Sequence, residues 1–198
     1  SGSTPRRAEP IEPTLTPIKR LEWMNKRIVL IAGCLAMLSS IGLAHAQGKR
    51  LLRVVPEVDL ARYAGQWYEI ARFPNRFQKR CAGEVTAQYT LQPSGKISVL
   101  NRCRLESGEQ IEAEGVARVA GKGQPNSILK VRFAPAFLSF IPLVWGDYQI
   151  IALSPDYTHA LVGDPTREYL WILSRSRQMD DATYNRLVDE ARNQGFDV

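Results

Sequence analysis

Eight short strand-like segments, some alternating between apolar and polar residues and some apolar on both faces, constrain the fold of this chain most. Turn-like sequences such as Pro93-Ser94-Gly95 and Asp164-Pro165-Thr166 separate them, and no helical period intervenes. The segments span residues 66–73, 85–91, 96–103, 109–119, 127–133, 147–153, 159–163 and 168–174. Evenly spaced strands of this length predict an all-β fold, either a sandwich or an up-and-down barrel.

One amphipathic helix follows the last of these segments. Its predicted features are an N-terminal capping aspartate, a single apolar face and a terminating glycine. The cap is Asp180 or Asp181, the face consists of Tyr184, Leu187, Val188 and Ala191, and the glycine is Gly195. This narrow apolar stripe predicts a helix that packs against the outside of the sheet.

The net charge of +6 is unevenly distributed along the chain. Residues 1–46 contain six basic and three acidic residues, which leaves 20 basic and 17 acidic residues from residue 47 onward. This small excess gives little support to binding of nucleic acid, and the sequence contains no nucleic-acid-binding motif. We therefore expect no nucleic-acid partner.

The first 46 residues indicate export rather than a part of the fold. Residues 1–23 are rich in Pro, Thr and charged residues, which predicts a disordered upstream segment or a remnant that is not native to the protein. Residues 24–46 have a positive start, an apolar run and a small-residue end, which predicts a signal peptide that is cleaved after Ala46. The apolar run is shorter than the ~20 residues of a membrane-spanning helix. Lipidation at Cys34, which ends a lipobox-like sequence, is the alternative to this cleavage, and the folded domain then comprises residues 47–198.

Cys81 and Cys103 remain in the exported part of the chain. An even number of cysteines in an oxidising compartment predicts a disulfide. If Leu91 faces Ile97 across the turn between them, Cys103 lies near residue 85 and within reach of Cys81. The alternative is a pair of unrelated buried thiols.

Three short motifs occur in the order and at the spacing of the lipocalin signature. They are Gly65-Gln66-Trp67-Tyr68, Pro155-Asp156-Tyr157 and Arg175. The longer segments 67–73 and 169–175 are more specific, and they resemble the bacterial lipocalins and their apolipoprotein-D-like relatives. The resemblance covers residues 55–198. It implies an eight-stranded antiparallel up-and-down β-barrel with the C-terminal helix packed outside.

The resemblance also implies structural roles for the signature residues. In lipocalins the tryptophan plugs the closed end of the barrel and the arginine packs across its indole, which places Arg175 on Trp67. Gly65 gives the chain room to turn into the first strand. Asp156 and Tyr157 form the second motif, between the sixth and seventh strands.

An interior cavity for a small hydrophobic ligand is a further implication of the resemblance. Strand parity counted from an inward-pointing Trp67, together with the family pattern, gives the residues expected to bind the ligand. They are Ala71, Phe73, Val85, Ala87, Tyr89, Val99, Asn101, Ala113, Val131, Phe133, Tyr148, Ile150, Val162, Tyr169 and Trp171. This mostly apolar wall predicts a fatty acid, lysophospholipid or similar ligand and a role in envelope lipid handling, in the periplasm or at the outer membrane.

Two loops are expected to share the open rim of the barrel. The loop after the first strand is basic, and the loop after the fifth strand is apolar. The apolar loop contains Phe137, Phe140, Ile141 and Trp145. Apolar side chains beside cations predict peripheral contact with an anionic membrane. The alternative is that the apolar loop folds inward as a lid.

The sequence gives little support for catalysis, and we expect no metal and no other cofactor. His159 is the single histidine after residue 46, and no nucleophile elbow or phosphate loop is present. Glu69, if it points into the barrel, is expected to pair with an arginine. Two other functions stay open: a lipocalin-type enzyme that acts on a lipid through a free cysteine thiol, and a ligand-free accessory protein of the envelope.

The expected oligomeric state is a monomer or a weak dimer. Lipocalins continue past the helix with a further short strand, whereas this sequence ends at Val198. A missing strand would expose a sheet edge through which two copies could associate, and the alternative is that the sequence is truncated.

Overall fold

The computed structural model describes residues 51–198, which form a closed antiparallel barrel. Its strands are β1 (Gly65–Arg72), β2 (Cys81–Leu91), β3 (Ile97–Leu105), β4 (Gln110–Val119), β5 (Ile128–Arg132), β6 (Gly146–Leu153), β7 (His159–Gly163) and β8 (Leu170–Ser174). Each strand pairs with the next and β8 pairs with β1, which confirms the up-and-down barrel and shows that the sandwich alternative is wrong. The predicted upstream segment, the signal peptide and Cys34 lie outside the described residues.

The strands lie close to the segments expected from the sequence. Leu91 pairs with Ile97, as predicted for the turn between β2 and β3. The main difference is that β2 begins at Cys81 rather than at residue 85, and its register to β3 shifts twice before Thr86. Each shift is a bulge, which bends the strand locally without ending it, because β2 pairs with β3 on both sides of the shifts. β2 therefore extends to Cys81.

A short helix that the sequence did not reveal helps to close one end of the barrel. Helix α2 (Leu60–Tyr63) is capped by Asp59, whose carboxylate accepts hydrogen bonds from the backbone N–H groups of Ala61 and Arg62. A single helical turn is too short to show a helical period, which is why the pattern did not predict it. Its last residue, Tyr63, is buried in the barrel interior.

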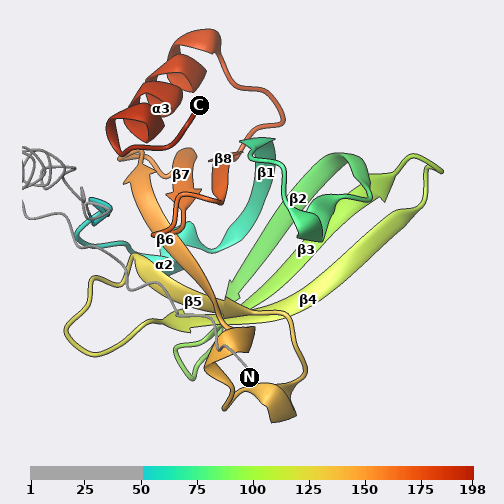
Figure 1. Ribbon diagram of the computed structural model, residues 1–198, viewed down its shortest axis with the longest axis vertical. Helices are drawn as coiled ribbons and strands as arrows, with labels where there is room; N and C mark the ends of the chain where they lie inside the picture. Colours follow the sequence, from blue (N-terminus) through green and yellow to red (C-terminus); the bar gives the residue numbers. More distant parts are fainter. Residues whose placement is uncertain (1–50) are drawn as a thin grey trace, which may run out of the picture. The chain divides into compact units, whose positions relative to one another are not determined.

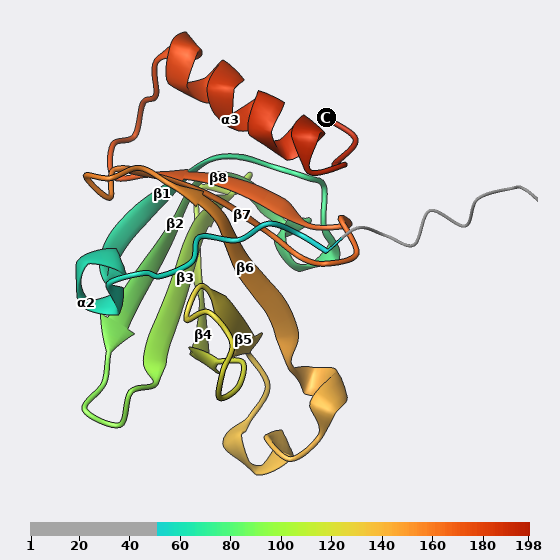
Figure 2. The same cartoon turned by 90° about the vertical axis from the view of Figure 1, so that its left-hand side faces the viewer.

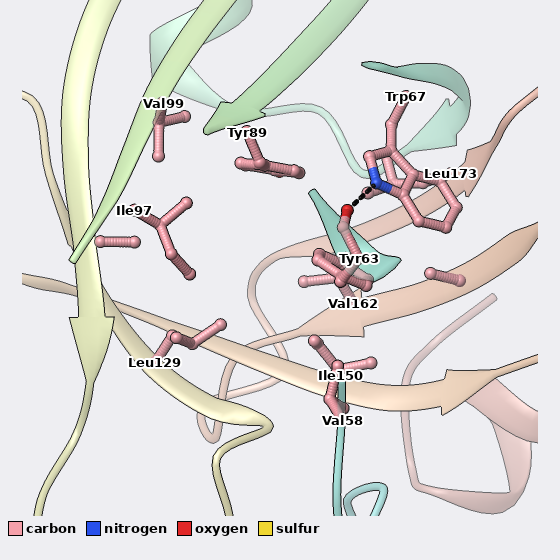
Figure 3. Close-up of a cluster of buried hydrophobic side chains, with 12 residues drawn as sticks. Val58, Tyr63, Trp67, Tyr89, Ile97, Val99, Leu129, Ile150, Val162 and Leu173 are labelled. Carbon is pink, nitrogen blue, oxygen red and sulfur yellow. Dashed lines mark hydrogen bonds between the residues drawn. The ribbon is translucent and has the colours of Figure 1, made fainter. Parts of the chain in front are cut away.

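The closed end of the barrel contains a cluster of buried apolar side chains (Figure 3). Trp67 from β1, Ile150 from β6 and Val162 from β7 are fully buried there. Ile97 from β3 and Leu129 from β5 belong to the same cluster. We refer to this cluster as the closed-end core.

A second core lies outside the barrel, beneath the C-terminal helix α3 (Asp181–Asn193). Asp180 caps the helix, and the chain turns away from it at Gly195, where φ is +85°. Leu187 and Ala191 are buried against side chains from the outer faces of β7 and β8. Figures 1 and 2 both show α3 lying beside these strands, which confirms the packing expected from its apolar stripe.

Two β-bulges place consecutive apolar residues beneath α3. The pairing of β1 with β8 shifts between Glu69 and Ala71, and the pairing of β6 with β7 shifts between Ile150 and Ala152. A bulge inserts one residue and therefore reverses the alternation of the two faces beyond it.

The bulge in β1 makes the expected inward position of Ala71 and Phe73 wrong. Both residues pack against the outer core beneath α3, where the centroids of the Phe73 and Phe196 rings are 6.1 Å apart. Strand parity counted from Trp67 therefore holds only as far as Glu69. Within residues 51–198 every strand of the closed barrel has a neighbour on both sides, and β1 pairs with β2 from Gly65 to Tyr68.

The other end of the barrel, which we call the mouth, carries longer loops with short 3-10 helices. Helix η1 (Arg76–Gln78) lies between β1 and β2, and helices η2 (Ala136–Leu138) and η3 (Pro142–Val144) lie between β5 and β6. The β5–β6 loop projects away from α3 in both views (Figures 1 and 2).

Candidate functional site

The barrel interior contains a cavity of about 750 Å³ between the closed-end core and the mouth loops. This volume falls within the roughly 300–1,000 Å³ of small-molecule sites in proteins. Most residues expected to bind the ligand lie on its wall. They are Val85, Ala87, Tyr89, Val99, Asn101, Ala113, Val131, Phe133, Tyr148, Tyr169 and Trp171. The wall is mostly apolar, with a few hydroxyl and amide groups.

Ile150 and Val162 point into the barrel without reaching the cavity. Both are fully buried in the closed-end core. Their expected position on the cavity wall is therefore wrong. Strand parity gives the face on which a side chain lies, but it does not give the depth at which close packing ends.

The wall also includes residues that the sequence did not single out. Ile111 and Ala117 lie there and share the parity of Ala113 along β4, so alternation alone could have identified them. Tyr63 and Gln78 also line the cavity but come from α2 and η1, and no strand pattern points to them.

Trp67 and Arg175 lie at the closed end of the barrel, below the cavity. The guanidinium carbon of Arg175 is 3.9 Å from the centroid of the Trp67 ring, which confirms the predicted cation–π pair. The guanidinium also donates hydrogen bonds to the backbone carbonyls of residues 62, 63, 64 and 66. The Trp67 indole N–H donates to the Tyr63 carbonyl at 2.8 Å (Figure 3). These contacts fasten α2 to the start of β1, so their role is structural.

The second signature motif holds the same end of the barrel together. The Tyr157 hydroxyl accepts a hydrogen bond from the Asp59 N–H at 2.9 Å, and the Arg62 guanidinium lies 4.0 Å above the Tyr157 ring. The Asp156 carboxylate accepts hydrogen bonds from the hydroxyl and the N–H of Thr158. The turn between β6 and β7 is thereby attached to α2.

Three tyrosines from different elements meet at the floor of the cavity. The Tyr148 hydroxyl of β6 lies 2.7 Å from the Tyr63 hydroxyl of α2 and 3.1 Å from the Tyr89 hydroxyl of β2. Burial raises the pKa of Tyr89 to about 12 and raises the pKa values of Tyr63 and Tyr148 well above 10. All three hydroxyls, which we call the tyrosine triad, are therefore protonated at neutral pH.

A polar network borders the cavity nearer the mouth. The Glu69 side chain is 7% exposed and forms an ion pair with Arg72, as expected for an inward-pointing Glu69. Gln78 Nε2 donates a hydrogen bond to the same carboxylate at 2.6 Å, and the Trp171 indole N–H donates to Gln78 Oε1 at 3.2 Å. The buried carboxylate thus has two partners, and the network fixes Trp171 in the wall.

The rim of the mouth exposes large apolar side chains. Phe137, Phe140 and Leu143 of the β5–β6 loop are 74%, 78% and 94% exposed. Phe77 of η1 is also exposed, while Ile141 is half-buried. The rings of Phe137 and Phe140 thus do not fold inward. Three residues of the same loop nevertheless border the cavity, namely Leu143, Val144 and Trp145.

Trp145 differs from the exposed residues of its loop. The guanidinium carbons of Arg118 and Arg132 lie 4.3 Å and 5.3 Å from its ring centroid. Its indole N–H donates a hydrogen bond to the Ser139 carbonyl at 2.8 Å. Trp145 is therefore a fixed part of the rim, and the free apolar surface of the loop is that of Phe137, Phe140 and Leu143.

Cys81 and Cys103 form the predicted disulfide, and their Cα atoms are 5.6 Å apart. The bridge joins β2 to β3, and both cysteines line the cavity. Because neither sulfur is a free thiol, the thiol-based enzyme alternative lacks its nucleophile in this structure.

Within residues 51–198, no group of three or more His, Cys, Asp or Glu side chains is placed to hold a metal ion. No helix in the same range is both long enough and apolar enough to cross a membrane.

Known proteins resemble this chain in both sequence and structure. Residues 58–198 match the lipocalin-like domain family. The chain is 46% identical to temperature-induced lipocalin-1 of Arabidopsis thaliana over 151 residues, which are 76% of this chain and 80% of that protein. It is 37% identical to the outer membrane lipoprotein Blc of Escherichia coli strain K12 over 170 residues, which are 85% of this chain and 91% of that protein. Among solved structures, the cockroach allergen Per a 4 matches with a TM-score of 0.55 at 20% identity, over 74% of this chain and 87% of that chain.

Proposed function

The chain belongs to the lipocalin family, in the branch of the bacterial Blc proteins, and we propose that it carries or stores a fatty acid, a lysophospholipid or a similar lipid. Lipocalins are in general binding proteins for small hydrophobic ligands. The observation that carries the proposal is the cavity of about 750 Å³, which is mostly apolar and extends to the mouth loops.

The wall suits an apolar chain whose polar head stays at the mouth. Burial of a methylene group contributes about 0.8 kcal/mol, so a long acyl chain provides enough free energy for binding after the cost of association is subtracted. The paired Glu69 carboxylate and the amide of Gln78 lie at the head end of such a ligand. No catalytic step is part of the proposal.

We place the protein in the bacterial envelope, in the periplasm or at the outer membrane. The Blc relative is described as an outer membrane lipoprotein, which supports export. In this proposal residues 24–46 are the signal peptide and residues 47–198 the lipocalin domain, or Cys34 carries a lipid anchor. Mass spectrometry of the exported protein separates the two cases, since only the second retains a lipidated Cys34 at its N-terminus.

Titration of the delipidated protein with hexadecanoic acid and with a lysophospholipid tests the carrier function. We expect saturable binding of one ligand per chain by calorimetry, with a change in tryptophan fluorescence because Trp171 lies on the wall. Trp171→Phe should remove most of the fluorescence change while calorimetric binding remains. Absence of binding to either lipid in the calorimeter would contradict the proposal.

A pair of tryptophan substitutions on β4 tests whether the ligand binds inside the barrel. Ala113 lines the cavity, and its neighbour Glu114 is exposed and belongs to the opposite face of the strand. Ala113→Trp should fill the cavity and abolish binding, whereas Glu114→Trp should leave binding unchanged. Equal effects of the two substitutions would place the ligand elsewhere.

The exposed rim supports a second proposal, peripheral contact with an anionic membrane. Phe137, Phe140 and Leu143 project from one loop, and the other mouth loop supplies Arg76 and Lys79. Apolar side chains beside cations favour shallow insertion into an anionic bilayer. Phe140→Ser with Leu143→Ser should reduce binding to phosphatidylglycerol vesicles. The control is Leu91→Ser in the β2–β3 hairpin, which should bind like the wild type; unchanged vesicle binding in the double variant would refute membrane contact by this loop.

A further inference from the structure

The tyrosine triad contains one more hydrogen-bond donor than it can use internally. A tyrosine hydroxyl has a single O–H donor, so the triad has three donors. The structure shows two hydrogen bonds among them, Tyr63 to Tyr148 and Tyr148 to Tyr89, and no other partner for these hydroxyls among the described residues. Whichever way the protons point, one O–H remains without an acceptor.

This unpaired donor lies at the deep end of the cavity. Tyr63 and Tyr89 are 2% and 8% exposed, and all three tyrosines line the cavity floor. The Tyr63 ring packs on Trp67 with 5.0 Å between centroids, so the triad lies directly above the plug that closes the barrel. Burial raises the pKa of each hydroxyl, so all three keep their protons at neutral pH. The triad therefore retains three O–H donors for two internal hydrogen bonds.

Asn101 provides a second polar position on the same wall. Its Oδ1 atom is buried and has no hydrogen-bond partner among the described residues. Its neighbours across β2 and β4 are Ala87 and Ala113, which have no side-chain polar groups to offer. Asn101 is two residues along β3 from Val99, the partner of Tyr89, and therefore lies roughly 7 Å nearer the mouth.

We propose that the cavity selects lipids whose buried end carries a hydroxyl or carbonyl oxygen over lipids with a plain hydrocarbon end. The inference rests on the proposed carrier function and specifies its ligand class. A methyl end displaces water from the floor and leaves the triad's O–H unpaired, which is unfavourable. An oxygen at that end accepts the hydrogen bond, and a hydroxyl group partway along the chain would donate a hydrogen bond to Asn101 Oδ1.

The oxygen at the floor is a neutral one. Arg175 lies behind Trp67 with its guanidinium engaged by backbone carbonyls, so it is not placed to form an ion pair with a buried carboxylate. The Glu69 carboxylate, which adds to the effect of burial in raising the pKa of Tyr89, opposes a second negative charge there. A carboxylate moved from water into an apolar floor without a counter-charge loses much of its solvation. An acid group of the same ligand is therefore expected at the mouth.

The test compares hexadecanoic acid with 16-hydroxyhexadecanoic acid on the delipidated full chain by calorimetry. We expect the hydroxylated acid to bind about tenfold more tightly, the effect of one hydrogen bond to an otherwise unpaired donor. The triple variant Tyr63→Phe, Tyr89→Phe, Tyr148→Phe should bind both acids with equal affinity. Tyr68→Phe is the control, because Tyr68 lies between inward-facing residues of β1 and its ring packs against Arg177 outside the cavity.

The number of unpaired O–H donors also predicts the preference of the single variant Tyr148→Phe for the hydroxylated acid. Tyr148→Phe removes the shared partner and leaves Tyr63 and Tyr89 without a hydrogen bond to each other, so the preference should persist or increase. Near-UV circular dichroism checks that each variant is folded, and Tyr148→Phe keeps the inference testable if the triple variant is not. Loss of the preference in Tyr148→Phe would overturn the inference. Equal affinities in the wild type would overturn it while the carrier function stands, and binding of neither acid would overturn both.

Discussion

The two ends of the barrel are stabilised in different ways. At the closed end, Trp67 is fully buried and Arg175 combines a cation–π contact with several hydrogen bonds to backbone carbonyls. At the mouth, the disulfide links β2 to β3, and Phe137 and Leu143 remain exposed to solvent. The comparison indicates that buried packing and backbone hydrogen bonds stabilise the closed end, whereas a covalent bridge stabilises the strands at the mouth and leaves its loops available for ligand entry and surface contact.

The largest expected difference between the two ends is in the free energy of unfolding after truncation of one aromatic residue at each end. Trp67→Ala removes a fully buried indole and leaves a void, so the free energy of unfolding should fall by about 3–5 kcal/mol. Phe137→Ala removes an exposed ring and should change it by less than about 0.5 kcal/mol. Urea denaturation of both variants provides the measurement. Comparable losses would show that the mouth loop contributes to stability as much as the plug does.

Removal of the disulfide should have the next largest effect, this time at the mouth. Cys81 and Cys103 are 22 residues apart in sequence, and closing a loop of this size stabilises the fold by about 3 kcal/mol in the chain-entropy model. The variant with Cys81→Ala and Cys103→Ala should lose that amount in urea denaturation, and reduction of the wild type should reproduce the loss. Near-UV circular dichroism of the folded variant should keep the Trp67 signal, since the closed end contains no part of the bridge.

The sequence predicted the closed end better than the cavity. Trp67 and Arg175 were placed correctly because their contact belongs to a motif with fixed spacing. Eight strands followed from short strand-like segments between turn sequences, although both faces of β7 and β8 are buried and their residues do not alternate. Ala71 and Phe73 were misplaced because a bulge inserts a single residue and leaves no mark on composition.

The tyrosine triad shows a different limit of sequence-based reasoning. Tyr89 and Tyr148 lie on strands and were expected on the wall, but Tyr63 lies on a single helical turn with no period. Their hydroxyls meet because α2 folds back into the barrel next to Trp67. Contacts between elements distant in the chain depend on tertiary packing, which alternation along one strand does not contain.

Alanine substitutions at two glycines should give a smaller difference in the free energy of unfolding between the two ends. Gly65 at the closed end and Gly108 in the β3–β4 turn both have positive φ, +98° and +87°. Alanine at Gly108 meets no atom within 4 Å and should cost about 1 kcal/mol through the backbone conformation alone. Alanine at Gly65 also brings its Cβ to 3.2 Å from Arg175 Nη1 and should cost about 2 kcal/mol. Equal losses in urea denaturation would show that the Arg175 side chain shifts freely.

Protonation of Asp156, in the turn at the closed end, should produce the smallest change in the free energy of unfolding. Hydrogen bonds from Ser154 and then Thr158 lower the pKa of Asp156 from 3.8 to about 2. A pKa lower in the folded than in the unfolded chain means that the contribution to stability is complete above about pH 4. It is lost as the pH falls toward 2, so the free energy of unfolding should decrease across that window.

Asp156→Asn isolates this contribution, since it removes the titrating group from the turn that holds Tyr157 against α2. The decrease in unfolding free energy between pH 4 and pH 2 should be shallower in the variant than in the wild type. Carboxyl NMR of the wild type should locate the titration directly, and Thr158→Val should move it upward. An Asp156 titration at its ordinary pKa would mean that the turn is not held as described. The closed end would then depend on Trp67 and Arg175 without support from the second signature motif.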